Sequence, residues 1–495
     1  MNLQCNAEMI IVSTVSISVK KQRCIVRICV ILEGCYPYVT GGVSTWIHQY
    51  MSAMPQHEFV IWAIGADSSM KGKYKYTLPD NVVEIHEVFL NDALRQKGIP
   101  KRYKFSKQEI AALHNFVNCV SPDWDLLFKM YSQDRIDPIS FLMSEEFLNI
   151  LINLCEEEYP YTAFSDFFHT VRSMFLPVLY LLSLEAPEAD LFHSIATGYG
   201  GLLARLGSFK YNVPYMITEH GIYTREREEE IIRAKWVIPA FKKLWVKFFY
   251  MLSDCAYSKA SMVTSLYSDA RNIQIDMGCD PDKCVFIGNG IHYERFKDIP
   301  MKEPSDHIDM GAVLRIAPIK DVKTMIYAFA EAKERIPNAR LFIAGPEDDR
   351  QYAKECYDLV DLLEVDDVYF MGPINVVKHI GDFDFTILSS VSEGMPLSVL
   401  ESFAAGRPCV TTDVGSCKEL IQGSPGDDFG MAGFCVPPMD IPELTNALIQ
   451  MCSKPDLRYQ MGIAGRNRVA KFFLHDDMIR KYQSVYDEVF RRWQE

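Results

Sequence analysis

The feature that most constrains the fold is an alternation of short apolar runs with helix-like segments along most of the chain. The stretch "RICVILEG" (27–34) is mainly apolar and ends in Gly, which is typical of a strand buried on both faces. A Gly-rich turn and an amphipathic segment follow it. Strands that alternate with helices indicate a parallel sheet in an α/β domain. Similar runs lie at 58–65, 190–195, 214–221, 261–266 and 283–290.

A second series of the same kind fills the C-terminal part of the chain. It follows the polar stretch 292–309, which carries two prolines and is typical of a linker. At 495 residues the chain also exceeds what one hydrophobic core usually supports. We therefore predict an α/β protein with two Rossmann-like, doubly wound domains that face a central cleft. The second series lies at 311–316, 339–345, 367–372, 383–390, 408–413 and 433–438.

The domain boundaries follow from these two series. Residues from about 90 to 185 break the alternation and read as several helices, which indicates a helical insertion in the first domain. Residues 1–24 lack the basic segment of a signal peptide, and whether they are ordered stays open. The predicted units are an N-terminal extension (1–24), a first, acceptor domain (25–290), a linker (291–310), a second, donor domain (311–475) and a C-terminal helix (476–495) that packs back on the first domain.

Composition excludes some classes of function. The formal net charge of -14 argues against a large nucleic-acid footprint, which needs basic surface. The fourteen cysteines form no CxxC pair, so we expect reduced thiols in the cytosol. No apolar stretch approaches 18 uninterrupted residues, so we expect a soluble protein. The segment 236–252 mixes Trp, Phe and Lys, which suits either an interfacial membrane helix or, more commonly, a helix packed on its own domain.

Two glutamates in "SSVSEGMPLSVLESFAAGRP" (389–408) are separated by seven residues. Pro396 fits the first position of a short apolar helix, so Glu393 precedes the helix and Glu401 lies on its second turn. Free backbone N–H groups and the positive end of the helix dipole lie between them, which suits a phosphate. The same pattern also fits a capped helix with two solvated acids.

Glycines and cations occur at other predicted strand–helix junctions. Gly41 and Gly42 begin a helix and permit close backbone approach to an anion, although a tight turn without a ligand has the same sequence. Arg315 ends a predicted strand and Lys320 precedes the next helix. Two such cations can hold a diphosphate, or they can be an ordinary surface pair.

Two histidines also end predicted strands. His220 in "TEHGIY" is equally consistent with a catalytic residue and with a hydrogen-bonded core histidine. For His193 we favour a structural or substrate-lining role.

The pairs Asp123/Asp125 and Asp382/Asp384 form the short and common Asp-x-Asp pattern. The second pair starts a buried strand, at the end away from the cleft. We therefore predict no metal site.

With these residues placed, the chain resembles the retaining nucleotide-sugar glycosyltransferases of GT-B architecture. Their E-x7-E signature matches Glu393 and Glu401, and their Arg-x4-Lys pair matches Arg315 and Lys320. The stretches "EGCYPYVTGGVSTW", "TEHGIYTRERE" and "GNGI" make it most similar to the glycosyltransferases of bacterial Pel exopolysaccharide systems.

This resemblance implies roles for particular residues. Arg315 and Lys320 would bind the donor diphosphate, Glu401 the ribose and Glu393 the transferred sugar. The catalytic residues would be Glu393, His220, Lys320 and Arg315. The residues implied in nucleotide-sugar binding are Gly41, Gly42, Arg315, Lys320, Gly345, Gly372, Glu393, Gly394, Met395, Pro396, Leu397, Ser398 and Glu401.

The resemblance also implies a reaction and partners. The expected donor is a UDP-hexose such as UDP-glucose or an N-acetylated relative, and the acceptor is a growing exopolysaccharide. No cofactor or metal is expected. The implied location is the cytosol, with an inner-membrane synthesis and export complex as partner, and no nucleic acid is bound.

Two alternatives remain. A nucleotide-sugar 2-epimerase would need further acid/base carboxylates around the sugar, and no such cluster stands out in the sequence. A non-catalytic sugar-nucleotide-binding subunit is disfavoured by the complete set of Arg315, Lys320, Glu393 and Glu401.

Overall fold

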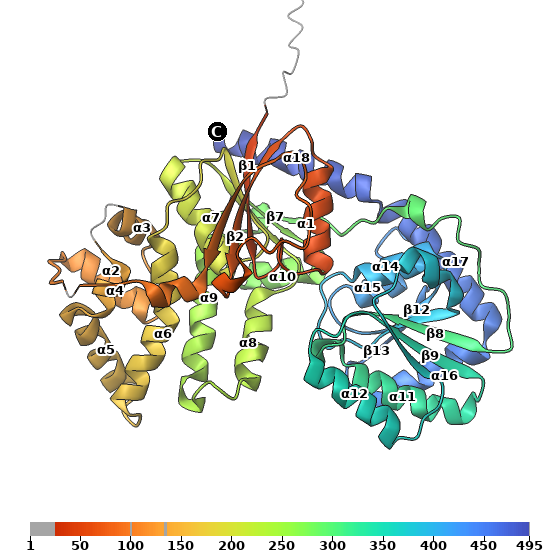
Figure 1. Cartoon of the computed structure of the whole chain (residues 1–495). Coiled ribbons are helices and arrows are strands. Elements are labelled where there is room, and N and C mark those ends of the chain that lie inside the picture. Colours follow the sequence, from red (N-terminus) through yellow and green to blue (C-terminus); the bar gives the residue numbers. More distant parts are fainter. Residues whose placement is uncertain (1–24, 100, 133–135, 495) are drawn as a thin grey trace, which may run out of the picture.

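The first lobe is built on a seven-stranded parallel sheet. The computed structural model describes residues 25–99, 101–132 and 136–494, so the predicted extension at 1–24 lies outside the described residues (Figure 1). The strand order β3-β2-β1-β4-β5-β6-β7 reverses direction between β1 and β4, as in a doubly wound fold. The strands are β1 Arg27–Glu33, β2 Glu58–Gly65, β3 Val82–Phe89, β4 Leu191–Ser194, β5 Tyr215–Glu219, β6 Met262–Ser265 and β7 Cys284–Phe286.

The second lobe repeats this plan with six parallel strands in the order β10-β9-β8-β11-β12-β13. Its reversal lies between β8 and β11, so each sheet has one crevice at the carboxyl ends of its two central strands. The predicted α/β architecture of two Rossmann-like domains is confirmed. The strands are β8 Ile308–Val313, β9 Ala339–Ala344, β10 Val368–Gly372, β11 Phe385–Leu388, β12 Cys409–Thr412 and β13 Gly433–Val436.

Helices cover both faces of each sheet (Figure 1). Many begin directly after a strand, as expected where apolar runs alternate with amphipathic segments. In the first lobe these helices are α1 Gly42–Ser52, α7 Gly198–Tyr211, α8 Tyr223–Arg233, α9 Lys242–Ser258 and α10 Ser268–Asp276. In the second lobe they are α11 Val322–Arg335, α12 Arg350–Leu362, α13 Val376–His379, α14 Leu397–Ala404, α15 Cys417–Gln422, α16 Ile441–Ser453 and α17 Pro455–Phe472.

Between β3 and β4 the chain forms a layer of helices beside the first sheet (Figure 1). Buried side chains such as Phe116, Phe141 and Phe175 join this layer to the core of the lobe. A short 3-10 helix, Leu90–Arg95, precedes these α-helices, and all of them lie within the region of about 90–185 expected from the sequence. The helices are α2 Lys107–Val117, α3 Trp124–Ser132, α4 Pro138–Leu142, α5 Glu145–Glu158 and α6 Phe164–Leu182.

The structure corrects the sequence interpretation at three places. Strand β3 was missed, because it lies at the edge of the sheet and carries Glu84 and Glu87 among its apolar residues. Strand β8 begins at Ile308, three residues before the predicted start of the second domain. Pro396 is the residue that caps α14 rather than its first helical residue.

The last helix, α18 His475–Gln494, returns to the first lobe (Figure 1). Tyr482 and Tyr486 belong to the same buried cluster as Trp46 and Tyr50 of α1. The hydroxyl of Tyr50 donates to that of Tyr486 at 2.5 Å. The first lobe is therefore completed by a segment more than 400 residues away in sequence.

The two passages of the chain between the lobes lie against each other. The amide of Ile291 donates to the carbonyl of Phe473 at 2.9 Å, and the amide of His475 donates to the carbonyl of Ile291 at 3.0 Å. The rings of His292 and His475 lie 4.0 Å apart, measured between centroids. These contacts hold both connections at one position beside the two lobes.

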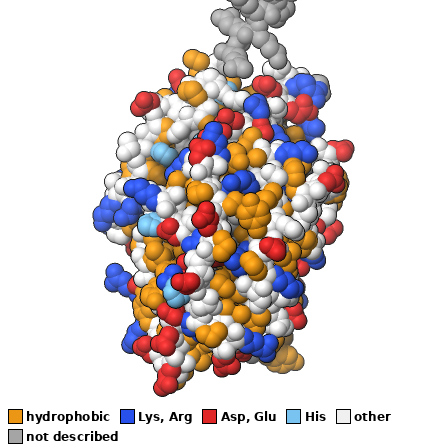
Figure 2. Space-filling model, turned by 90° about the vertical axis from the view of Figure 1, so that its right-hand side faces the viewer, with side chains coloured by type: hydrophobic (Ala, Val, Ile, Leu, Met, Phe, Trp, Pro, Cys, Tyr) orange, Lys and Arg blue, Asp and Glu red, His pale blue; other side chains and the backbone are white. Residues whose placement is uncertain are grey.

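Figure 2 shows the outer face of the second lobe, where acidic and basic side chains are mixed rather than gathered by sign.

Every cysteine in the described ranges is a free thiol. None of the helices that the structure describes is both long and apolar enough to cross a bilayer.

Candidate functional site

A cavity of about 740 Å³ lies between the lobes, at the carboxyl ends of both sheets. On the first lobe its wall includes the turn between β1 and α1 and the turn between β5 and α8. On the second lobe its wall includes the segment after β8 and the segment before α14. The cavity is therefore at the crevices that the two strand orders create.

Most of the predicted binding residues line this cavity. They come from both lobes and from four different turns. The predicted residues in the wall are Gly41, Gly42, His220, Arg315, Lys320, Glu393, Gly394, Met395, Pro396, Leu397 and Ser398.

The glycine turn offers free backbone at the start of α1. Gly41 precedes the first residue of the helix in extended conformation, with φ 172°, and no side chain caps the helix. A Cβ added to Gly41 or Gly42 would meet no atom within 4 Å. The first amides of α1 are therefore approachable, which suits contact with an anion.

Lys320 and Glu393 form an ion pair in the wall of the second lobe. The hydroxyl of Ser390 donates to the same Glu393 oxygen at 2.5 Å. The hydroxyl of Ser389 donates to the backbone carbonyl of Lys320 at 3.0 Å, which joins the loop of Glu393 to the loop of Lys320. A diphosphate bound by Lys320 would share the ammonium group with Glu393.

Arg315 follows β8 and lines the same wall. Its guanidinium pairs with Asp348, on the turn before α12. The side chain is 42% exposed, and a guanidinium group has five N–H donors, so the contact with Asp348 does not use all of them. The sequence did not indicate Asp348 as its partner.

His220 follows β5 with its ring edge against the indole of Trp46, at 4.5 Å between centroids. Burial lowers the pKa of His220 to about 4, so the ring is neutral at physiological pH. Its Nε2 atom is buried and has no hydrogen-bond partner among the residues that the structure describes. A neutral imidazole with an unused nitrogen can donate to or accept from a ligand.

Comparison with known proteins agrees with this architecture. Residues 26–282, just over half of the chain, match the family described as "Domain of unknown function (DUF3492)". The chain belongs to the DUF3492 family. Residues 308–454 match the family described as "Glycosyl transferases group 1". This DUF3492 protein is thus a glycosyltransferase of the group 1 type.

Sequence relatives belong to the same class of enzyme, and solved structures share the fold. One relative is the MMP alpha-(1->4)-mannosyltransferase of Mycolicibacterium hassiacum, 22% identical over 57% of this chain and 67% of its own. Another is the UDP-Gal:alpha-D-GlcNAc-diphosphoundecaprenol alpha-1,3-galactosyltransferase of Escherichia coli, 23% identical over 71% and 92%. Anabaena Alr3699/HepE, solved with UDP and glucose, matches with a TM-score of 0.57, 14% identity and coverage of 93% and 99%. Sucrose-phosphate synthase from Thermosynechococcus elongatus matches with a TM-score of 0.59, 15% identity and coverage of 94% and 99%. The fold is that of GT-B glycosyltransferases.

Three predicted residues of the DUF3492 protein do not line the cavity: Gly345, Gly372 and Glu401. The amide of Gly345 donates to the carbonyl of Gly372 at 2.9 Å, so these two glycines lie together. A Cβ on Gly345, whose φ is 151°, would stand 1.6 Å from the carbonyl oxygen of Leu314. The close approach of the two chain segments explains this glycine without a ligand.

Glu401 lies on the second turn of α14, one helical turn after the lining residue Leu397. Burial raises its pKa to about 7, against the opposing effect of Arg295.

The other histidine and the Asp-x-Asp pairs have structural partners. His193 is fully buried and does not line the cavity; its two ring nitrogens lie 2.9 Å from the Tyr486 hydroxyl and 2.8 Å from the Thr218 hydroxyl. Asp125 pairs with Arg205 and Lys259, and Asp384 pairs with Arg458. Within the described ranges, no three His, Cys, Asp or Glu side chains are placed to hold a metal ion.

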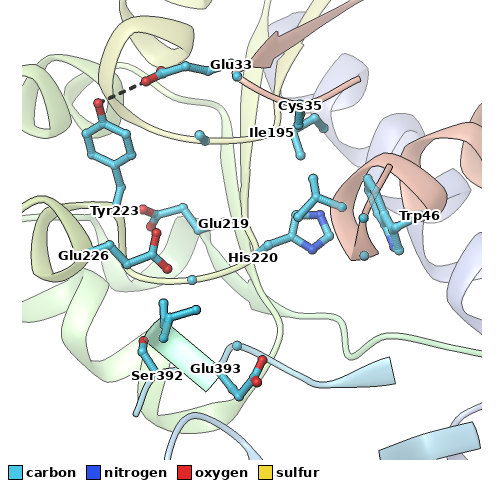
Figure 3. A pocket seen from close by; sticks show the side chains of 18 of the residues that line it. Glu33, Cys35, Trp46, Ile195, Glu219, His220, Tyr223, Glu226, Ser392 and Glu393 are labelled. Carbon is cyan, nitrogen blue, oxygen red and sulfur yellow. Dashed lines mark hydrogen bonds between the residues drawn. The ribbon is translucent and has the colours of Figure 1, made fainter. Parts of the chain in front are cut away.

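Sequence reasoning missed a group of carboxylates around the cavity. Glu33 ends β1, Glu219 ends β5 and Glu226 lies in the first turn of α8, and together with Glu393 they surround one space (Figure 3). No such cluster stands out in the sequence, and only the fold brings these carboxylates together. Their sequence positions span 360 residues, and the only available signal was an acid at the carboxyl end of two predicted strands.

These carboxylates differ in how much hydrogen bonding they already have. Glu219 is buried and accepts from Tyr257, Gln274 and Thr197, and burial raises its pKa. Glu33 accepts from the amide of Gly200 at 3.1 Å and the hydroxyl of Tyr223 at 3.2 Å.

Glu226 faces the cavity more openly (Figure 3). Desolvation of the carboxyl group raises the pKa of Glu226 to about 7 against the opposing charge of Arg227, and the carboxylates of Glu219, Glu229 and Glu393 act in the same direction as desolvation. Of the group, Glu226 is the carboxyl best suited to exchange a proton near neutral pH.

Proposed function

We propose that this protein is a retaining glycosyltransferase that moves a hexose from a UDP-sugar to a growing exopolysaccharide of the Pel type. The observation that carries the proposal is the convergence of Arg315, Lys320 and the start of α14 on one cavity, opposite the open glycine turn of α1. Cations and helix N-termini are the groups that proteins use to bind a diphosphate.

The charges of the cavity suit the developing charges of glycosyl transfer. The sugar passes through an oxocarbenium-like transition state, while negative charge builds on the departing diphosphate. Arg315, Lys320 and the amides near Leu397 and Ser398 would stabilise that negative charge where it develops. Glu393 would accept hydroxyls of the transferred sugar and Glu401 those of the ribose.

Retention would proceed by attack from the face that the diphosphate leaves. The acceptor oxygen forms a bond to the anomeric carbon as the bond to the diphosphate oxygen breaks, and the departing diphosphate takes the acceptor proton. We propose no metal in this step, since the two cations supply the positive charge. The first-lobe wall, with Tyr223, Glu226 and Arg227, would face the acceptor.

UDP as the nucleotide rests on the resemblance to Pel-system enzymes and is supported by the UDP-bound state of the similar Anabaena structure. The same resemblance supports a place at the inner face of the membrane, beside a synthesis and export complex.

The carboxylate cluster makes the 2-epimerase a second candidate. An epimerase moves protons at the sugar ring and needs carboxyls that are free to take and return them. Glu219 already accepts three hydrogen bonds, and Glu393 is paired with Lys320. Of these three carboxyls, only Glu226 both faces the cavity openly and has a pKa near neutrality. The transferase therefore remains the better supported function.

One experiment separates these functions. The purified protein is titrated with UDP, ADP and GDP by calorimetry, then incubated with UDP-glucose and UDP-N-acetylglucosamine in the presence of EDTA. We expect saturable binding of UDP and slow release of UDP from one donor, lost in Lys320→Ala. If the donor sugar is epimerised and no UDP is released, the proposed function changes from transferase to epimerase. Absence of saturable nucleotide binding would contradict both.

A further inference from the structure

The free end of the α8–α9 hairpin exposes an unusual group of apolar side chains. The hairpin projects from the first lobe, and its far end is the loop between Arg233 and Lys242 (Figure 1). On and beside this loop, Ile232 is 58% exposed, Trp236 66% and Ile238 42%. We call residues 232–243 the hairpin end. Large apolar side chains gathered at a protruding end mark an interaction site more often than scattered ones do.

The exposed side chains stand on a packed base. The ring of Trp236 meets that of Trp245 edge-on, at 5.4 Å between centroids. Phe241 is buried and meets Tyr159 at 5.7 Å and Phe167 at 5.9 Å, beside the end of α5 and the start of α6. The hairpin end is therefore held in shape by its own aromatic contacts.

The charge of the hairpin end is opposite to that of the whole protein. The chain carries a net charge of -14, yet the 23 residues from 231 to 253 contain no Asp or Glu. Four cations lie on the hairpin end: Arg233, Lys235, Lys242 and Lys243. Acids beside the hairpin end are engaged with cations, since Glu229 lies 3.8 Å from Arg233 and Glu158 lies 3.1 Å from Lys247.

We propose that the hairpin end docks on the surface of an anionic lipid bilayer. Trp236, Ile232 and Ile238 would enter the headgroup region, where Trp is favoured because it is apolar with one polar edge. The surrounding Lys and Arg side chains would meet the lipid phosphates. The combination of exposed Trp and Ile with surrounding cations matches a lipid surface, which takes up apolar side chains directly beside its phosphates.

Docking would orient the cavity. Helix α8 has eleven residues, so it spans about 16 Å. Its first turn carries Tyr223 and Glu226 in the cavity wall, and its last residue, Arg233, belongs to the hairpin end. If the proposed transferase function holds, an acceptor attached to the bilayer would meet the cavity within about that distance of the membrane.

The test measures binding of the full-length protein to lipid vesicles without any nucleotide. Vesicles of phosphatidylcholine with about 40 mol% phosphatidylglycerol, which gives a strongly anionic surface, are compared with vesicles of phosphatidylcholine alone. Two variants alter the hairpin end, Trp236→Ala/Ile238→Ala and Lys235→Glu/Lys243→Glu. Two matched controls alter exposed residues of α12 on the second lobe, Leu362→Ala and Lys354→Glu.

We expect the wild type and both controls to sediment with anionic vesicles and to be released by salt. The apolar variant should bind roughly tenfold more weakly. Each reversed cation should cost roughly fivefold or more. All variants should keep the thermal midpoint of the wild type, because the changed side chains are exposed.

Three results would overturn the docking proposal. These are no binding of the wild type to bare anionic vesicles at low salt, equal binding by the hairpin variants, or binding only when a membrane protein is added, which would assign the hairpin end to a protein contact. UDP binding is measured in parallel on the same samples. Vesicle binding without UDP binding would contradict the proposed function and leave docking intact. UDP binding without vesicle binding would contradict docking and leave the proposed function intact.

Discussion

Gly394 lies directly against the backbone of His220, so that a Cβ on Gly394 would stand 1.7 Å from the His220 carbonyl oxygen. The two residues belong to different lobes and both line the cavity. The next residue, Gly221, has the Glu226 carboxyl beside it. A Cβ on Gly221 would lie 2.1 Å from Oε1 of Glu226. Two glycines therefore allow His220, Glu226 and Glu393 to meet where the lobes touch.

This contact predicts that Gly394→Ala impairs activity. The added methyl group cannot fit beside a backbone oxygen, so the loops of Glu393 and His220 must move apart. We expect kcat/KM to fall by about two orders of magnitude. Gly288→Ala is the matched control, because the nearest atoms that its methyl group would meet belong to side chains, Met395 at 3.2 Å and Phe286 at 3.4 Å, rather than to backbone. Equal activity of both variants would show that the contact has no part in catalysis.

Gly41→Ala should separate folding from binding. Its backbone is extended and its added Cβ meets no atom within 4 Å, so we expect stability within about 0.5 kcal/mol of the wild type. The methyl group would nevertheless occupy space beside the free amides of α1. The KM for the sugar nucleotide should rise roughly tenfold. A normal KM with a normal thermal midpoint would remove this turn from the donor site.

Lys320→Ala and Glu393→Ala should each lower turnover by about two orders of magnitude or more, because each removes a charge from the proposed diphosphate and sugar site. Since the two side chains are paired, the double variant should lose little beyond either single variant. Steady-state kinetics of the three variants test this. Near-normal turnover in both single variants would rule out the site, and strictly additive losses would show that the pair does not act as a unit.

Glu226 predicts a pH dependence of activity. Its pKa is raised to about 7, so its charged fraction grows as pH rises through neutrality. If the carboxylate accepts a hydrogen bond from the acceptor hydroxyl, kcat/KM of the wild type should rise with pH through about 7. Glu226→Gln should lose this rise and should lower kcat/KM by roughly tenfold to a hundredfold at pH 8.

Glu229→Gln, on the exposed side of the same helix, should keep the wild-type profile. A Glu226→Gln profile that still rises near pH 7 would assign the rise to another group.

Glu401 predicts a pH dependence of stability. Burial raises its pKa from 4.5 to about 7, so the folded state holds the proton more tightly than the unfolded state. The resulting stabilisation, about 3 kcal/mol, is fully present below pH 4.5 and is lost as pH rises through 7. Glu401→Gln carries no such titration.

Urea unfolding of both proteins at pH 4.5 and pH 8 measures the difference. We expect the variant to gain up to about 3 kcal/mol relative to the wild type between the two pH values. Parallel pH curves would show that Glu401 is charged in the folded protein at pH 8 without a penalty.

Local sequence was sufficient for most strands and insufficient for one. Of the thirteen strands that the structure describes, twelve fall on apolar runs recognisable along the chain, because strands covered by helices on both faces are largely apolar. The edge strand Val82–Phe89 has one neighbour and half-exposed side chains, so its apolar pattern is diluted by Glu84, His86 and Glu87.

The candidate site divides in the same way. Arg315, Lys320, Glu393 and the glycines of the α1 turn were visible because each lies at a strand–helix junction with a recognisable spacing. Glu33, Glu219 and Glu226 have no mutual spacing, since they come from β1, β5 and α8. For Gly345, the resemblance implied a nucleotide contact; the close approach of Leu314 gives this glycine a structural reason, and the nucleotide contact stays a prediction.

The sequence alone determined two α/β domains with parallel sheets and the residues at the ends of their strands. Local apolar runs indicate which segments are buried, and their alternation with helices indicates that the strands run parallel. The tertiary structure decided which of those residues share one space, how the lobes meet at Gly394 and His220, and which carboxyls are pushed toward neutrality. Such properties depend on atoms brought together from distant parts of the chain, where exclusion of water and short separations set the charge of each group.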